Sequence, residues 1–173
     1  MTGDAEIHIV PYDEGWPAQF EAERKSLDGL LQPWLVGPIE HVGSTAVPGL
    51  PAKPVIDIMA AIGDLDESRA SLDLLRAAGY QYAPYRTDVM HWFCKPGFMH
   101  RTHHLHLVPY ASSLWIERLA FRDYLRANSA AAAEYADLKK RLAAVHRKDR
   151  EAYTEAKSEF VVRVVQAALG RER

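Results

Sequence analysis

The chain has 173 residues, of which 48% are hydrophobic and 25% are charged, so it can bury a core of ordinary globular composition. Its formal net charge of -2 excludes a general basic field that would bind nucleic acid in bulk, and the single cysteine, Cys94, excludes an internal disulfide and a cysteine-based zinc cluster. Residues 1–9 lack a signal-peptide core, and no apolar run approaches the roughly 20 residues of a membrane span. We therefore expect a cytoplasmic protein.

The first third of the chain predicts one helix and two strands. Apolar residues recur at helical spacing as far as Leu31, and the second strand is almost continuously apolar, as is typical of a sheet centre. The connection between the strands is rich in proline and predicts a loop. In order, we expect an extended piece at 7–12, a helix opened by Asp13, a break at Gly37-Pro38, a strand at 39–43, a loop at 46–54 and a strand at 54–62.

The rest of the chain predicts a helix, three strands and then helices only. Gly79 is a C-cap signal for the first of these helices. The expected elements are a helix at 66–78, strands at 80–85, 89–95 and 103–108, and helices at 113–127, 130–147 and 149–169. This order predicts an α/β (α+β) fold with a mixed sheet and flanking helices. We divide it into an α/β domain at 1–111 and C-terminal helices at 112–173 that pack on the same domain.

The small-residue turn that follows the strand at 39–43 has the composition of a phosphate site. Gly43 lets the backbone approach an anion closely, and Ser44, Thr45 and the nearby amides can bond phosphate oxygens. Lys53, in the rigid loop that follows, can bring a cation to the same place. Such turns are common and a lone lysine is usually solvated, so the residues alone leave a plain structural turn open.

Asp57 is the one carboxylate within an apolar strand. A carboxylate in such surroundings needs a cation, a capping N–H group or a functional site beside it. On a rigid strand it can hold Mg²⁺ together with substrate phosphates. Met59 lies on the same face but cannot ligate a hard cation, so the second acid of a metal pair is missing.

Four histidines lie close together near the last strand: His100, His103, His104 and His106. In a strand, His104 and His106 share one face, and His103 points to the other. Two imidazoles on one face can ligate a metal, bind phosphate or act as acid and base. The alternative is a pair of sheet histidines that bond their neighbours. We favour function for this pair and a structural role for the other two.

The C-terminal helices combine basic and aromatic residues, which can hold phosphates and stack bases. Examples are Tyr135, Lys139, Tyr153 and Lys157. For most of these positions we prefer an amphipathic bundle with aromatic residues inside and basic residues in water. Arg122, near the middle of its helix between aromatic neighbours, is the exception, and we place it in the phosphate site.

These segments together resemble the GrpB family. The resemblance lies in residues 41–50 and 52–58, in Tyr12-Asp13 with Trp16 and Phe20, in residues 104–107 and 119–126, and in the C-terminal helices. It implies a nucleotidyltransferase-like fold, with Gly43, Ser44 and Asp57 in phosphate and metal positions. Met59 then stands where that superfamily has a second acid, and His104 or His106 where it has a third.

We therefore expect a nucleotidyltransferase-like protein that binds a nucleoside triphosphate and a divalent metal, with Mg²⁺ first among the candidates. Asp57, His104 and His106 are the expected catalytic and metal-binding residues. Two alternatives stay open: a non-catalytic module that binds a nucleotide or a CoA-like ligand, and a hydrolase with a transition metal on the same residues. The expected partner is a nucleotide or another phosphate-bearing small molecule, with no membrane and with nucleic acid less favoured. The expected phosphate-binding residues are Gly43, Ser44, Thr45, Lys53 and Arg122.

Overall fold

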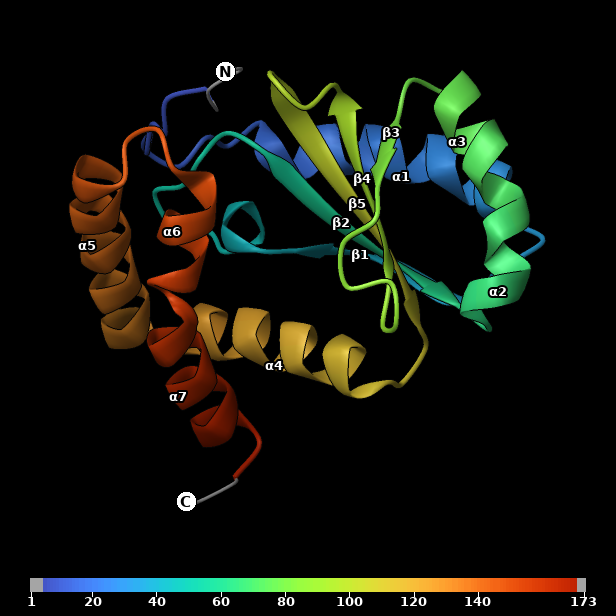
Figure 1. The fold of residues 1–173 in the computed structure, drawn as a ribbon. Helices are drawn as coiled ribbons and strands as arrows, with labels where there is room; N and C mark the ends of the chain where they lie inside the picture. The colour runs from blue at the N-terminus through green and yellow to red at the C-terminus, as the bar shows by residue number, and fades with distance from the viewer. Residues whose placement is uncertain (1–4, 171–173) are drawn as a thin grey trace.

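The computed structural model, which describes residues 5–170, contains a five-stranded mixed sheet with helices on both faces (Figure 1). The strand order is β1-β2-β5-β4-β3, in which β2 and β5 are parallel and the other neighbours are antiparallel. This confirms the predicted mixed α/β class. The strands are β1 (Leu35–Val42), β2 (Ile56–Ile62), β3 (Gln81–Ala83), β4 (His91–Pro96) and β5 (Arg101–Pro109).

The helices divide between the two faces of the sheet. The largest core cluster packs α1 and the α2–α3 segment on one face, and a second cluster packs α4 on the other. Helices α5, α6 and α7 lie beside the end of α4 (Figure 1). The helical elements are α1 (Trp16–Leu31), η1 (Ser44–Ala46), α2 (Leu65–Ser68), η2 (Arg69–Ser71), α3 (Leu72–Ala77), α4 (Ser113–Ala127), α5 (Ser129–Val145), α6 (Arg150–Glu155) and α7 (Ser158–Ala168).

The C-terminal helices are joined to the loop after β1 by a separate apolar cluster. Val47 and Leu50 of this loop pack with residues of α4, α5 and α7, among them Tyr135 and Phe160, whose rings stack with their centroids 4.9 Å apart. Burial of each large side chain stabilises this contact by about 1.5–3 kcal/mol. The cluster therefore fixes the helices beside the Gly43–Ala46 turn. The proposed boundary between 1–111 and 112–173 falls just before α4 and stays a prediction.

Strand alternation decides which face each residue of β2 occupies. Ile56 and Ile58 are buried against α1, whereas Met59 belongs to the cluster beneath α4. Because successive side chains of a strand point to opposite faces, Asp57 must share the α4 face with Met59. The apolar alternation of β2 thus places its one carboxylate on the side where the C-terminal helices lie.

Three predicted boundaries are wrong. Gly37-Pro38 does not break the chain before the strand, because both residues lie inside β1, an edge strand whose pairing is irregular between Leu35 and Ile39. The helix expected at 66–78 is divided, since the hydroxyls of Ser68 and Ser71 donate to backbone carbonyls three residues earlier and tighten that turn. The helix expected at 149–169 is also two helices, α6 and α7, with Lys157 between them.

The other expected elements agree with the structure to within a few residues at each end. Within the described part of the chain, no helix combines the length and the apolar composition that crossing a bilayer requires.

Candidate functional site: a cleft between the sheet and the C-terminal helices

Asp57, His104 and His106 converge on the α4 face of the sheet. Asp57 on β2 pairs in register with His104 on the parallel strand β5, and Met59 pairs with His106. Asp57 Oδ1 lies 3.0 Å from His104 Nδ1 and 3.6 Å from His106 Nε2. His103 points to the other face, as predicted, where it lies within electrostatic reach of Glu23 and Lys95. The three predicted residues therefore form one group.

The protonation states of this group favour a carboxylate beside a neutral imidazole. Burial raises the pKa of Asp57, but the hydrogen bond with His104 and the closeness of both imidazoles outweigh it and hold that pKa well below its usual value. Burial, reinforced by the charge of Arg118, lowers the pKa of His106 to about 3. At neutral pH His106 is therefore uncharged, as a metal ligand or a general base must be.

Several nitrogens of the two imidazoles lack a hydrogen-bond partner within residues 5–170. His104 Nε2 and both ring nitrogens of His106 are buried without a hydrogen-bond partner among the described residues. A buried polar atom in that state costs about 1–3 kcal/mol. The group therefore retains free coordinating or hydrogen-bonding capacity at the site where sequence reasoning expected chemistry.

The Gly43 turn packs directly on the carboxylate of Asp57. Gly43 has a φ of +73°, and a Cβ atom placed there would lie 2.5 Å from Asp57 Oδ2. Ser44 follows at the start of η1, near the buried Tyr135 on α5. Burial raises the pKa of the Tyr135 hydroxyl to about 12, and its interaction with the Ser44 side chain partly offsets this rise. Only glycine satisfies both the backbone conformation and the close approach. Gly43 and Ser44 are thus brought to Asp57, as predicted.

Thr45 supports the turn through a buried side chain. Its side chain is buried, and its Oγ1 atom lies 2.9 Å from His41 Nε2 and donates to the carbonyl of Val55 at 3.4 Å. The His41 ring stacks on Phe20 of α1. The Thr45 hydroxyl is therefore used within the fold, where it holds the turn, and its expected phosphate contact stays a prediction.

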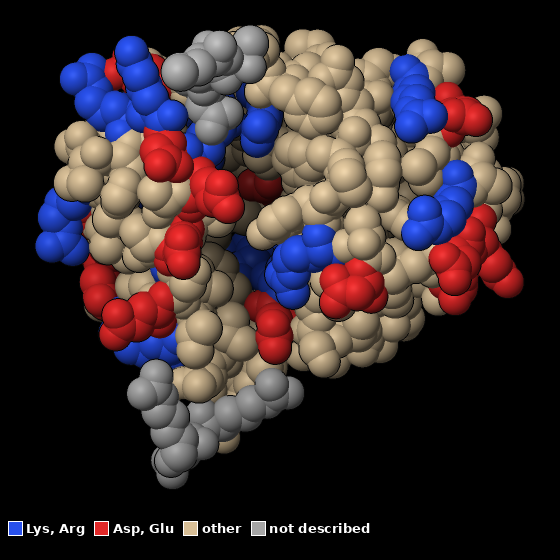
Figure 2. All heavy atoms as spheres, viewed as in Figure 1, with Lys and Arg blue, Asp and Glu red and all other residues tan. Residues whose placement is uncertain are grey.

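A hollow lies between the C-terminal helices and the sheet. Figure 2 shows it near the centre of this face, with basic side chains at its edge and an acidic side chain deep inside. Lys53 and Lys157 lie over the ring of Tyr153, 5.0 and 4.2 Å from its centroid. Lys139 lies 4.8 Å from the centroid of Tyr135 and donates to the carbonyl of Pro51. The predicted Lys53 therefore has two lysine neighbours.

The lysine cluster, defined as Lys53, Lys139 and Lys157, concentrates positive charge at this cleft. Burial, followed by mutual repulsion within the cluster, lowers the pKa of Lys139 and of Lys157 to about 7. Asp57 acts on Lys157 in the opposite direction, which places this lysine within electrostatic reach of the carboxylate. In residues 5–170, no carboxylate lies within ion-pair distance of Lys139 or Lys157. Lys139 and Lys157 are therefore suited to an anion that residues 5–170 do not supply.

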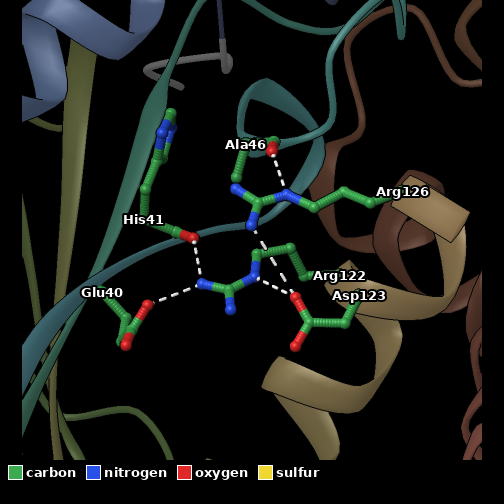
Figure 3. A network of polar contacts seen from close by, with 6 residues as sticks. All are labelled: Glu40, His41, Ala46, Arg122, Asp123 and Arg126. Carbon is green, nitrogen blue, oxygen red and sulfur yellow. Dashed lines mark hydrogen bonds and ion pairs between the residues drawn. The ribbon is translucent and has the colours of Figure 1, made fainter.

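Arg122 belongs to a different network (Figure 3). Its Nη1 atom donates to Glu40 at 2.7 Å and to the carbonyl of His41 at 3.0 Å, and its Nε atom donates to Asp123 at 2.7 Å. One turn later, Arg126 donates to the carbonyl of Ala46 at 2.8 Å. Two carboxylates and a carbonyl engage the guanidinium of Arg122, and the phosphate role expected for it stays a prediction. Together the two arginines clamp both ends of the turn to α4.

Sequence reasoning underrated Lys139 and Lys157. Each follows a buried tyrosine by four residues, Tyr135 and Tyr153, so each lysine lies over a ring of its own segment. This repeated Tyr-x-x-x-Lys pattern in consecutive helical segments was the available signal. Amphipathic spacing alone assigned both lysines to solvent.

The contact between Gly43 and Asp57 can be tested by comparison with Gly49, a control glycine that also has a positive φ. Gly49→Ala introduces strain at a φ of +78° but meets no atom within 4 Å, so we expect it to lower the free energy of unfolding by about 1–2 kcal/mol. Gly43→Ala adds the collision with Asp57 and should cost at least about 1 kcal/mol more. Urea denaturation of both variants measures the difference. Equal losses would mean that the turn does not press on Asp57 in solution.

Comparisons with known proteins agree with the resemblance found in the sequence. The family model described as GrpB protein matches residues 6–167. The UPF0157 protein PA4798 of Pseudomonas aeruginosa is 40% identical over 98% of this chain and 71% of its own length. A protein named dephospho-CoA kinase, from Mycolicibacterium paratuberculosis, is 38% identical over 79 residues, which cover 44% of this chain and 19% of that protein. The crystal structure of GrpB from Enterococcus faecalis superposes with a TM-score of 0.86 at 32% identity, covering 95% of this chain and 98% of that one. The chain therefore belongs to the GrpB family.

Proposed function

We propose that the cleft binds a nucleoside triphosphate or a closely related phosphate ester, and that the protein transfers a nucleotidyl group from it. The observation that carries the proposal is the lysine cluster, in which Lys157 lies within electrostatic reach of Asp57, the carboxylate against which the Gly43 turn packs. Holding like charges together lowers the stability of the free protein, and a bound polyanion would recover that free energy. A chain of phosphates has the charge and the length that such an arrangement suits.

The roles of the residues follow from their exposure and contacts. Lys53 and Lys157 are partly exposed and would contact phosphate oxygens as point charges. Lys139 is only 2% exposed and is bonded to Pro51, so it would raise the local positive potential and hold the loop. Ser44 and the backbone of its turn would bind the phosphate nearest Asp57. In a transfer reaction these groups would offset the charge that develops on the leaving pyrophosphate.

The expected Mg²⁺ is not favoured by the residues present. Mg²⁺ prefers oxygen ligands in a near-octahedral set, usually one or two carboxylates with phosphates and waters. Here Asp57 is the one carboxylate of the group, its near neighbours are imidazoles, and Met59 is fully buried. The residues present therefore do not fit Mg²⁺ as the resident metal.

A second function, ligand binding without catalysis, has its own support. Methionine occupies position 59, where a two-metal transfer would need a second acid. The short match to a protein named dephospho-CoA kinase makes a CoA-like ligand, which also carries phosphates on a nucleotide, a reasonable candidate. Pyrophosphate release from a bound triphosphate in the presence of candidate acceptors would favour transfer. Tight binding without any turnover would favour the binding module.

Replacement of Lys157 tests the phosphate site directly. We expect Lys157→Met to weaken triphosphate binding by about tenfold or more, or about 1.4 kcal/mol, because it removes a cation from the cleft. The matched control is Lys140→Met, which removes the same charge from an exposed position of α5. Isothermal titration calorimetry compares the three proteins. If both variants bind like the wild type, the lysine cluster is not the phosphate site.

The lowered lysine pKa values predict proton uptake on binding. In the free protein, the pKa of Lys139 and of Lys157 is about 7, so both ammonium groups are largely deprotonated at pH 8.5. A bound polyanion favours the charged form, so binding should take up protons and weaken as the pH rises from 8 to about 10. Calorimetry in two buffers of different ionisation enthalpy counts the protons. Binding that is independent of pH in this window would contradict the proposal.

The same pKa values fix the sign of the pH dependence of stability. Because folding lowers both lysine pKa values, the unfolded chain binds more protons between about pH 7 and its usual lysine pKa. The contribution of these lysines is therefore most unfavourable below pH 7 and improves as the pH rises through that window.

A further inference from the structure

We infer that Asp57, His104 and His106 form a site for a divalent first-row transition metal of the Zn²⁺, Co²⁺ or Mn²⁺ class in preference to Mg²⁺. The inference rests on the proposed function only for the role of the ion beside the phosphates. The site itself stands on three side chains of the free protein. Their one oxygen and two nitrogen ligand atoms all lie within 4.8 Å of one another.

Two of the three separations fit a shared ion. Ligand atoms about 2.0–2.2 Å from one metal lie roughly 2.8–3.6 Å from each other in octahedral or tetrahedral geometry. Asp57 Oδ1 is 3.0 Å from His104 Nδ1 and 3.6 Å from His106 Nε2. Both strands are central in the sheet and are paired in register, so the side chains start from a rigid base. The ligand atoms of His104 and His106 lie within 4.8 Å of each other, and rotation of the rings would bring both to one ion.

The donor atoms select the kind of metal. Two imidazoles and one carboxylate, with remaining positions open, suit Zn, Co, Ni, Fe or Mn, whereas Mg²⁺ takes oxygen ligands. Glu40 on β1 lies on the same face of the sheet as Asp57. Arg122 engages its carboxylate, so Glu40 does not supply a second acidic ligand. His106 Nε2 is buried without a hydrogen-bond partner among residues 5–170, and a bound metal would satisfy it.

The charge around the site predicts coupling between the metal and the anion. Arg118 and Lys157 act electrostatically on this group, so they oppose a bare cation. A bound phosphate chain would neutralise these charges and offer oxygen ligands at the open positions. By reciprocity, metal and phosphate ligand should each tighten the binding of the other by the same factor.

Cobalt titration of untagged, metal-free protein tests the inference without nucleotide. At pH 7.5 we expect Co²⁺ to produce visible absorption bands that saturate at one ion per chain. Zn²⁺ should abolish these bands at near-equimolar concentration, and Mg²⁺ should leave them unchanged at about a thousandfold excess. Removal of the bands by Mg²⁺ at a concentration comparable with that of Co²⁺ would overturn the proposal.

Three histidine variants give the test its specificity. We expect His104→Gln and His106→Gln each to weaken Co²⁺ binding by about tenfold or more. His103→Gln, on the same strand but the opposite face, should bind as the wild type does. Thermal unfolding identifies any variant that fails to fold, and the remaining ligand variant then decides. Wild-type affinity in a folded His104 or His106 variant would overturn the site. If the wild-type protein gives the cobalt spectrum but binds no triphosphate, the metal site stands and only the proposed function is contradicted.

Discussion

The contact between the Asp57 carboxylate and the two imidazoles of β5 is the constraint on which the candidate site depends. It exists because β2 and β5 are adjacent, parallel and in register, so alternation sends Asp57, His104 and His106 to one face. On that face, Gly43 closes over the carboxylate with no room for a side chain. The carboxylate and the two imidazoles are thereby held at a fixed place on this face of the sheet.

The charges around this group come from another part of the chain. Asp57 lies within electrostatic reach of Arg118 from α4 and of Lys157, whose cluster also includes Lys53 from the loop before β2 and Lys139 from α5. Such an excess of positive charge in a partly enclosed cleft favours ligands with several negative charges. The sheet supplies the fixed geometry, and the helices supply most of the attraction.

Arg122 and Arg126 connect these two parts. By donating to the carbonyls of His41 and Ala46, they hold the ends of the turn against α4, and Glu40 and Asp123 fix the orientation of Arg122 (Figure 3). A charged hydrogen bond of this kind is worth about 1.5–3 kcal/mol. These arginines therefore position the proposed phosphate-binding turn through its backbone.

The sequence predicted what depends on local periodicity, and it failed where tertiary surroundings decide. Alternation along β5 was enough to separate His104 and His106 from His103, whereas their contact with Asp57 depends on the parallel pairing of β2 and β5. It could not distinguish the buried Lys139 from a solvated lysine, because that difference arises only when α5 packs on the loop at Pro51. It likewise could not show that Glu40 engages Arg122, since that carboxylate is far away in the chain.

A crystal structure with a non-hydrolysable triphosphate tests the central claim most directly. The account predicts phosphate groups between Ser44 and Lys157, with the phosphate nearest the turn beside Asp57. A triphosphate bound elsewhere would contradict it. One such place is the pocket of about 300 Å³ that Tyr12, Phe20, Thr45 and Arg126 line with other residues.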